Sequence, residues 1–249
     1  MQQINILEPS VKSLLLSLGF NGKEMALGTG FIVQAPCGYV LITNRHNVTG
    51  KDNRTGELLS KTGGIPNQVS IWHNLKGRLG QWIKLVEPLL ESDRPLWIEH
   101  PVLGEHADVV ALPLTQTKGI DFYPYDLDWK SSLQQLMPSD ILSVVGFPYG
   151  LSTGGRLAIW ATGFVASEPS LPLPTFLIDC RTRQGQSGSA VIAQRNGGAY
   201  PTVGGGVAVG GGAITEFLGI YSGRVNVDSD IGLVWKASII KELIESIGK

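Results

Sequence analysis

Short apolar runs separated by turn residues follow one another along nearly the whole chain, and this pattern constrains the fold more than any other feature. One group of expected strands lies at about 12–20, 25–34, 39–43, 67–74, 79–86 and 108–113. A second group lies at about 141–147, 156–166, 175–180, 189–193, 215–222 and 231–236. Many short strands with turns between them are typical of antiparallel barrels and sandwiches. The sequence therefore predicts an all-β fold of two six-stranded antiparallel β-barrels.

The first expected hairpin depends on the pair Asn21-Gly22. The apolar residues before it, from Val11 to Leu18, also recur at helical spacing, so this stretch alone is compatible with a helix or a strand. Asn-Gly between two apolar runs strongly favours a two-residue hairpin turn, because both residues tolerate positive φ. We therefore expect two strands here.

The chain divides into two halves joined by a segment that is poor in long apolar runs. We assign residues 1–115 to an N-terminal barrel, 116–139 to the crossing and 140–249 to a C-terminal barrel, all within one domain. The chain ends in a predicted helix, because its last apolar residues fall on one helical face. These residues are Ile239, Ile240, Leu243, Ile244 and Ile247.

Two segments interrupt the strand pattern. Residues 50–64 are polar and form an expected surface loop, and residues 196–212 are rich in glycine. A phosphate-binding loop would need Lys-Ser or Lys-Thr after its glycines, and none is present, so we expect a mobile hairpin. Both segments are candidates for gates over a site.

Composition limits the class of partner. The chain has 249 residues, 43% hydrophobic and 16% charged, which suits a globular protein with a sizeable core. A net charge of −1 gives no reason to expect a nucleic acid or an anionic membrane as partner. The start carries no positively charged region, and the apolar run after it is too short to span a membrane. We therefore expect no signal peptide, no membrane span and a cytoplasmic location.

The pentapeptide from Gly185 to Ser189 is the main candidate for chemistry. It holds Ser187 between glycines, just before an apolar run, which predicts a tight turn feeding a buried strand. The N–H groups of such a turn can converge on a developing oxyanion. An ordinary Gly/Ser hairpin loop remains the alternative for this motif taken alone.

A base and an acid precede this motif in suitable places. His46 follows an apolar strand, and Asp108 begins another. A histidine can take the proton of a serine hydroxyl, and a carboxylate can orient that histidine. Rival candidates for these roles fit the pattern less well. Asp93, Glu105 and His106 do not begin a matching apolar strand, and Ser189 has only one flanking glycine.

With these residues in the order His46, Asp108 and Ser187, the chain resembles the trypsin-like serine peptidases. Gly28–Val33 is similar to the strand before the family's histidine, and Leu218–Gly223 is similar to the strand that flanks its substrate. The resemblance runs over nearly the whole chain.

The resemblance is closest to the bacterial HtrA-like protease domain, without a PDZ module. Asp179 stands eight residues before Ser187, as the corresponding aspartate does in HtrA-type members. Secreted animal members are rich in disulfides, whereas this chain has only Cys37 and Cys180. We expect no bridge between them, although a single bridge is the open alternative.

The resemblance implies a chymotrypsin-like double barrel and a serine endopeptidase that hydrolyses polypeptides through an acyl-enzyme, without a cofactor. The alternative is a catalytically silent or partner-gated domain that acts mainly as a protein-binding module. That alternative includes an activating or targeting protein partner. His73, His100 and His106 lack metal-ligand spacing, so we expect no metal site.

The resemblance also implies roles for residues around the nucleophile. The backbone N–H groups of Gly185 and Ser187 would form the oxyanion hole. The substrate pocket would be bordered by Arg181, Gln184, Ser222, Gly223 and Arg224.

Two positions in this region suggest specificity and regulation. Arg181 aligns with the base of the family's primary pocket, where a guanidinium would favour an acidic side chain. In zymogen-type members an aspartate precedes the serine and pairs with a newly cut N-terminus. Gln186 holds that position here, so we expect no activation by N-terminal cleavage.

Overall fold

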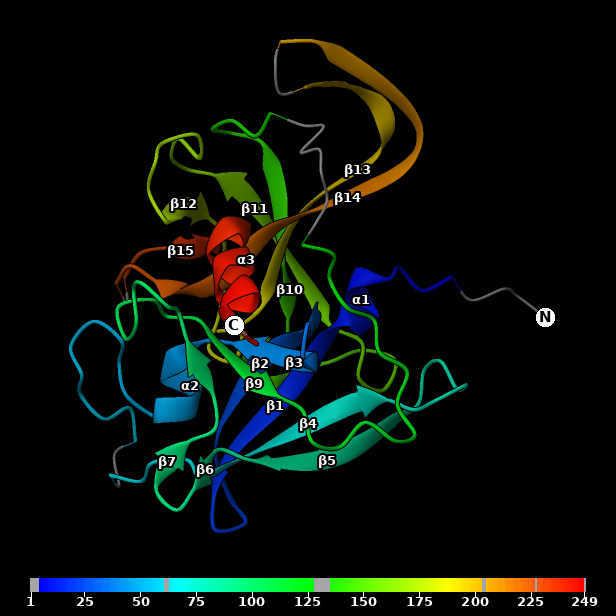
Figure 1. Ribbon diagram of the computed structural model, residues 1–249. Helices are drawn as coiled ribbons and strands as arrows, with labels where there is room; N and C mark the ends of the chain where they lie inside the picture. Colours follow the sequence, from blue (N-terminus) through cyan, green and yellow to red (C-terminus); the bar gives the residue numbers. More distant parts are fainter. Residues whose placement is uncertain (1–4, 61–62, 128–134, 203–204, 227, 249) are drawn as a thin grey trace.

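The computed structural model describes residues 5–60, 63–127, 135–202, 205–226 and 228–248 (Figure 1). Residues 128–134 of the expected crossing lie outside these ranges. Within them, the chain forms two antiparallel β-sheets stacked one above the other in the view of Figure 1, with a helix at the C-terminal end. This arrangement confirms the predicted all-β class.

The N-terminal sheet has seven strands in the order β5-β4-β1-β2-β3-β9-β8, one more than predicted. The extra strand, β8, has only two residues and pairs with β9. The strands are β1 (Ser13–Phe20), β2 (Lys23–Ala35), β3 (Gly38–Thr43), β4 (Gln68–Asn74), β5 (Trp82–Pro88), β8 (Ile98–Glu99) and β9 (Val110–Pro113). A separate ribbon pairs β6 (Leu90–Glu91) with β7 (Arg94–Pro95), and two short helices, α1 (Pro9–Lys12) and α2 (Arg45–Thr49), flank the sheet.

The first hairpin forms as its turn residues predict. Asn21 and Gly22 both adopt positive φ, 49° and 81°, and connect β1 to β2. Residues Ser13 to Gly19 of β1 are all buried, because the strand lies between β2 and β4 in the sheet. Tertiary packing therefore decides in favour of the strand over the helix that the spacing alone would permit.

The C-terminal sheet is a closed six-stranded barrel in the order β10-β11-β12-β15-β14-β13. Its strands are β10 (Ile141–Gly146), β11 (Ile159–Val165), β12 (Thr175–Asp179), β13 (Ala190–Pro201), β14 (Val207–Arg224) and β15 (Ile231–Lys236). A single 3₁₀ turn, η1 (Pro148–Gly150), follows β10.

Two strands of this barrel are much longer than predicted. Beyond the barrel, β13 and β14 continue to pair from Gln194↔Thr215 to Pro201↔Val207 and project outward as a curved ribbon (Figure 1). We call residues 194–215 the β13–β14 arm. The glycine-rich segment is thus a paired hairpin; its predicted mobility stays a prediction.

The C-terminal helix α3 (Ala237–Ser246) covers the junction between the sheets. All five apolar residues predicted on its inner face are buried, and they join a core that includes Phe31 of β2 and Val145 of β10. One hydrophobic core therefore continues from one sheet into the other, which fixes the two sheets relative to each other.

Two further observations concern the sequence predictions. Cys37 is exposed and Cys180 is buried, and both are free thiols. No helix within the described ranges is long and apolar enough to cross a membrane.

Candidate active site

A histidine and an aspartate from the N-terminal sheet form the first half of the site. His46 Nδ1 lies 2.7 Å from Asp108 Oδ2, and the His46 backbone N–H donates to Asp108 Oδ1 at 3.0 Å. These contacts fix both the position of the histidine and the plane of its ring. We assign the proton to Nδ1, because it faces the carboxylate, which leaves Nε2 as the free base.

The chain brings these residues together because β3 ends just before His46. Thr43 is the last residue of β3, and α2 starts at Arg45, so His46 lies in the first turn of this helix. The Asn44 side chain donates to the backbone oxygen of Asp108 at 2.6 Å. This bond ties the start of α2 to the segment that enters β9.

The environment of the pair shifts both pKa values. Burial lowers the pKa of His46, but the negative charge and hydrogen bond of Asp108 outweigh burial and raise it above its ordinary value. Burial raises the pKa of Asp108, but the charge and hydrogen bonds of His46 and a hydrogen bond from Ser222 lower it by more, so the pKa lies below its ordinary value. The pair therefore favours an ionised aspartate.

Ser187 lies in the turn between β12 and β13, and this turn is packed onto the N-terminal sheet. The Ser187 carbonyl accepts hydrogen bonds from Thr29 N at 2.9 Å and from Asn47 Nδ2 at 3.2 Å. Gly188 has φ +88°, and a Cβ there would lie 1.9 Å from the backbone oxygen of Thr29. Only glycine fits this position, so the motif's second glycine is required by contact between the sheets.

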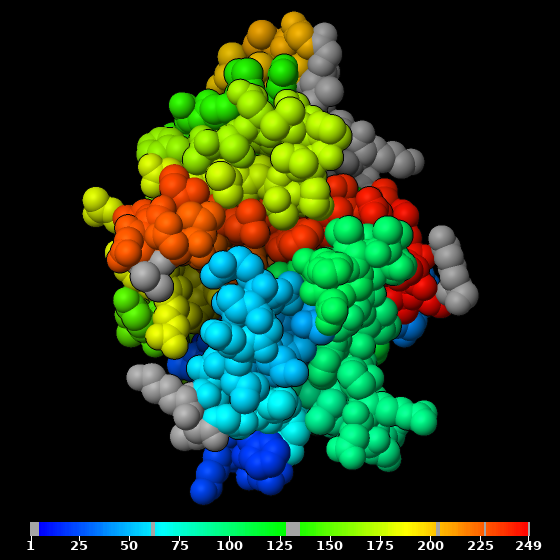
Figure 2. All heavy atoms as spheres, turned by 90° about the vertical axis from the view of Figure 1, so that its left-hand side faces the viewer, coloured from blue at the N-terminus to red at the C-terminus, as the bar shows by residue number. Residues whose placement is uncertain are grey.

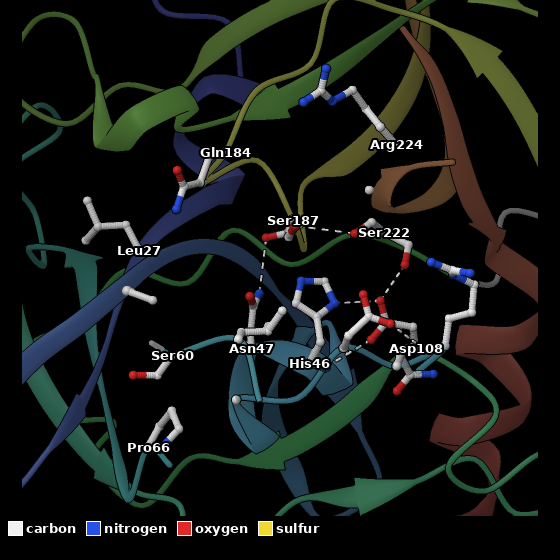
Figure 3. Close-up of a pocket in the computed structure, with 18 of the residues that line it drawn as sticks. Leu27, His46, Asn47, Ser60, Pro66, Asp108, Gln184, Ser187, Ser222 and Arg224 are labelled. Carbon is white, nitrogen blue, oxygen red and sulfur yellow. Dashed lines mark hydrogen bonds and ion pairs between the residues drawn. The ribbon is translucent and has the colours of Figure 1, made fainter. Parts of the chain in front are cut away.

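Ser222 connects the two halves of the site. Its carbonyl accepts a hydrogen bond from Ser187 Oγ at 3.3 Å, and its hydroxyl donates to Asp108 Oδ2 (Figure 3). The sequence suggested only a substrate-binding role for Ser222. No signal in the sequence reveals the bond to Asp108, because it depends on how the end of β14 meets the other sheet.

Ser187 Oγ and the His46 ring line the same cavity. Among the hydrogen bonds of the described residues, none joins them; the Ser187 hydroxyl points at Ser222 O instead. A proton transfer between Ser187 and His46 would require Ser187 Oγ to rotate from Ser222 toward the ring.

Two backbone N–H groups beside Ser187 are available for an oxyanion. Within the described part of the chain, neither Gly185 N nor Ser187 N donates to a protein acceptor. Gln184 O accepts a hydrogen bond from Tyr149 N at 2.6 Å. Because the C=O and N–H of a trans peptide point in opposite directions, the Gly185 N–H points away from Tyr149. Paired free donors of this kind can stabilise a tetrahedral oxyanion.

Gln186 supports the turn from inside the protein. Its side chain is fully buried, and its Oε1 accepts a hydrogen bond from Arg183 N at 2.8 Å. An uncharged amide therefore holds the turn that carries Gly185 and Ser187.

The site opens into a cavity of about 630 Å³ that contains His46, Asp108 and Ser187. In Figure 3, Leu27, Ser60 and Pro66 lie on one side of Ser187, and Ser222 and Arg224 lie on the other. The first side comes from the start of β2 and from loop residues within 50–60 and 63–66, which lie on the face drawn in Figure 2. Only the loop was anticipated from the sequence, as a candidate gate.

The structure places four of the five predicted pocket residues at the cavity wall. Gln184, Ser222, Gly223 and Arg224 line it, whereas Arg181 does not. Arg181 is exposed on the outside of the turn, so its assignment to the pocket base is wrong in this structure. The physical reason is alternation along the chain: Cys180 and Thr182, on either side of Arg181, are buried, so Arg181 faces solvent.

The rival triad members are placed elsewhere. Ser189 is fully buried and does not line the cavity. Glu105 forms an ion pair with Arg45 at 3.6 Å, and Asp93 lies in the turn between β6 and β7. Neither they nor His106 line the cavity.

The remaining histidines have structural contacts. Burial lowers the pKa of His73 to about 4. His100 Nδ1 accepts hydrogen bonds from Val102 N and Leu103 N, at 3.3 and 3.1 Å. The described residues contain no group of three or more His, Cys, Asp or Glu side chains arranged to hold a metal ion.

No protein-family model and no curated protein matches the sequence. Solved structures do match the fold. A serine endoprotease from Yersinia pestis aligns with a TM-score of 0.52 at 13% identity, over 98% of this chain and 69% of that chain. The active form of the Rv3671c protease from M. tuberculosis aligns with a TM-score of 0.51 at 17% identity, over 96% of this chain and 82% of that one.

A thermostable serine protease, AL20, from an extremophilic microorganism aligns with a TM-score of 0.54 at 11% identity, over 96% of this chain and 98% of that one. At such identities the likeness shows the fold alone. The chain has a trypsin-like fold, and its structural neighbours are serine proteases.

Proposed function

We propose that this protein is a serine endopeptidase that uses Ser187 as nucleophile, His46 as general base and Asp108 to orient the histidine. The observation that carries the proposal is the hydrogen bond between His46 Nδ1 and Asp108 Oδ2, 2.7 Å long, at the wall of the cavity that also holds Ser187. A purely structural histidine would not need a buried carboxylate behind it and a serine hydroxyl in the same cavity.

The proposed reaction starts when Ser187 Oγ attacks the carbonyl carbon of a peptide bond while His46 Nε2 takes the hydroxyl proton. The N–H groups of Gly185 and Ser187 donate to the resulting oxyanion. The C–N bond then breaks, and His46 returns the proton to the leaving amine. Water, activated by His46, hydrolyses the acyl-Ser187 ester and regenerates the enzyme.

The second candidate is a gated or silent domain that binds protein partners, and one observation favours it. The Ser187 hydroxyl donates its hydrogen bond to Ser222 O rather than to His46. Catalytic hydrogen bonds are often long or misaligned before substrate binds, so this orientation is also compatible with an active enzyme.

A fluorophosphonate probe separates the two candidates, because it reacts with an activated serine without needing a peptide substrate. We expect the intact chain to be labelled at Ser187, with labelling lost in Ser187→Ala and in His46→Ala. Ser189→Ala is the matched control and should still be labelled, because the Ser189 hydroxyl has no hydrogen-bond partner within the described residues. A folded chain that resists the probe would support the binding module instead.

A further inference from the structure

The cavity wall beside Ser187 is backed by a buried pair of hydroxyl groups. Thr182 and Tyr221 are 0% and 2% exposed, and their hydroxyl oxygens lie 2.5 Å apart. Tyr221 precedes the lining residue Ser222, so the pair lies directly behind the wall. The Tyr221 ring also packs against Gly232, where an added Cβ would come within 2.6 Å of it. The space behind this part of the wall is therefore filled by side chains.

The same side of the cavity carries a positive charge. Arg224 lines the cavity and is exposed to solvent, and Figure 3 shows its side chain on the side of Ser187 away from His46 and Pro66. Burial raises the pKa of Tyr221 to about 12, while the Thr182 hydrogen bond and the charge of Arg224 act in the opposite direction. The guanidinium therefore lies within electrostatic reach of the buried pair.

No carboxylate of the cavity is available to neutralise Arg224. The two acidic residues that line the cavity are Asp52 and Asp108. Asp108 accepts from His46 and Ser222, and Asp52 accepts from the backbone N–H groups of residues 54 and 55 at 2.9 and 2.8 Å. Within the described ranges, Arg224 takes part in no ion pair.

We propose that this pocket selects an aspartate or glutamate side chain immediately before the cleaved bond, with Arg224 as the residue that determines the preference. The proposal rests on the proposed peptidase function. A carboxylate fits a guanidinium through charge-assisted, bidentate hydrogen bonds. The positive charge of Arg224 also repels lysine and arginine side chains.

A panel of fluorogenic peptides that differ only in this residue tests the proposal. The residues are Asp, Glu, Asn, Gln, Ala, Lys and Phe, and kcat/KM is measured for each. We expect Asp or Glu to be preferred over its amide by about tenfold, the effect of one exposed charge-assisted contact. Arg224→Gln should remove this ratio, and Arg224→Glu should reverse it. Arg181→Gln is the matched control and should keep the ratio, because Arg181 does not line the cavity.

Fluorophosphonate labelling of the same samples separates this proposal from the proposed function. A labelled enzyme that prefers Lys or Phe, or whose preference survives Arg224→Gln, would overturn the acidic specificity and leave the peptidase function standing. Binding to the Ser187→Ala variant then tests the pocket without any catalysis. Peptides that end in Asp should bind it more tightly than peptides that end in Asn, and equal affinity would overturn the proposal even for an inactive chain.

Discussion

Glycine is frequent in two regions, the turn that precedes β13 and the β13–β14 arm, and the reasons for its presence differ. In the turn before the strand, a Cβ on Gly185 would lie 2.5 Å from Phe147 O, and one on Gly188 would lie 1.9 Å from Thr29 O. In the β13–β14 arm, a Cβ on Gly211 or Gly212 would meet nothing within 4 Å. The turn needs glycine because backbones touch there, whereas Gly211 and Gly212 of the arm lie in open space.

The turn that carries Ser187 is held in position by packing, whereas residues of the arm should tolerate substitution. Contact with the N-terminal half of the protein fixes the backbone of the turn, as the positioning of a reactive hydroxyl requires. The arm exposes Val207 and Val209, at 70% and 81%, and Tyr200 is its one buried aromatic side chain. The same substitution made in both regions should therefore have very different effects.

The largest difference is expected when a carboxylate is replaced by its amide. Asp108→Asn removes the negative charge behind His46 and favours the wrong tautomer, so the rate of peptide cleavage should fall by roughly 10⁴-fold. Glu216→Gln, near the root of the arm, should change it less than about twofold. Measuring kcat/KM for both variants checks this. A similar loss in both would show that the arm takes part in the chemistry.

The second comparison replaces one glycine by alanine in each region. Gly188→Ala forces a Cβ against Thr29 O at positive φ, so we expect a loss of roughly 2–5 kcal/mol in the free energy of unfolding. Fluorophosphonate labelling should fall with it, because the turn must move. Gly211→Ala should stay within about 0.5 kcal/mol of the parent. Urea unfolding measures both, and an unfolding free energy unchanged by Gly188→Ala would contradict the packing argument.

The third effect is a shift in the pH at which His46 titrates. Because Asp108 raises the pKa of His46 above its ordinary value, the neutral base should become available only at correspondingly higher pH. Any stability that the charged histidine contributes is present below the ordinary pKa of about 6.5 and is lost as the pH rises through the raised value. An NMR titration of the His46 ring should show a lower midpoint in Asp108→Asn. A midpoint that does not move would mean that the pair is uncoupled.

The smallest effect is expected at the root of the arm. Burial raises the pKa of Glu216 to about 7, and the nearby Arg195 opposes this shift only in part. A carboxyl with a raised pKa takes up its proton more readily in the folded state, so it costs stability at neutral pH and this cost disappears as the pH falls. Glu216→Gln should therefore stabilise the protein at pH 8 by less than about 1 kcal/mol, because the group is only partly buried. Thermal unfolding at pH 5 and pH 8 checks the sign.

The sequence predicted the strands well wherever the alternation of apolar and polar residues and the turn residues indicate the same strand boundaries. The turn at Asn21-Gly22, the strand before His46 and the C-terminal helix all lie where local patterns placed them. The extent of β13 and β14 was not predictable, because glycine has low strand propensity and the arm gains its hydrogen bonds only from pairing with itself.

At the site, residue types, their order and the resemblance to trypsin-like serine peptidases predicted His46, Asp108 and Ser187 as neighbours, and all three line one cavity. The contacts of the residues that surround these three were less predictable. The hydrogen bond from Ser222 to Asp108 and the outward position of Arg181 both depend on where loops of two sheets meet. A shift of one residue in a loop changes which side chain faces the cavity, and no local pattern in the sequence specifies it.

The two sheets divide the proposed chemistry in the order in which a ribosome makes the chain. By the end of β9, the growing protein carries His46 and Asp108 but no nucleophile. Ser187 follows later, and its turn is held by Thr29 of β2 and Asn47 of α2, which were made first. On the proposed mechanism, a partly synthesised chain cannot cut its neighbours, and hydrolysis begins only when the second barrel closes onto the first sheet.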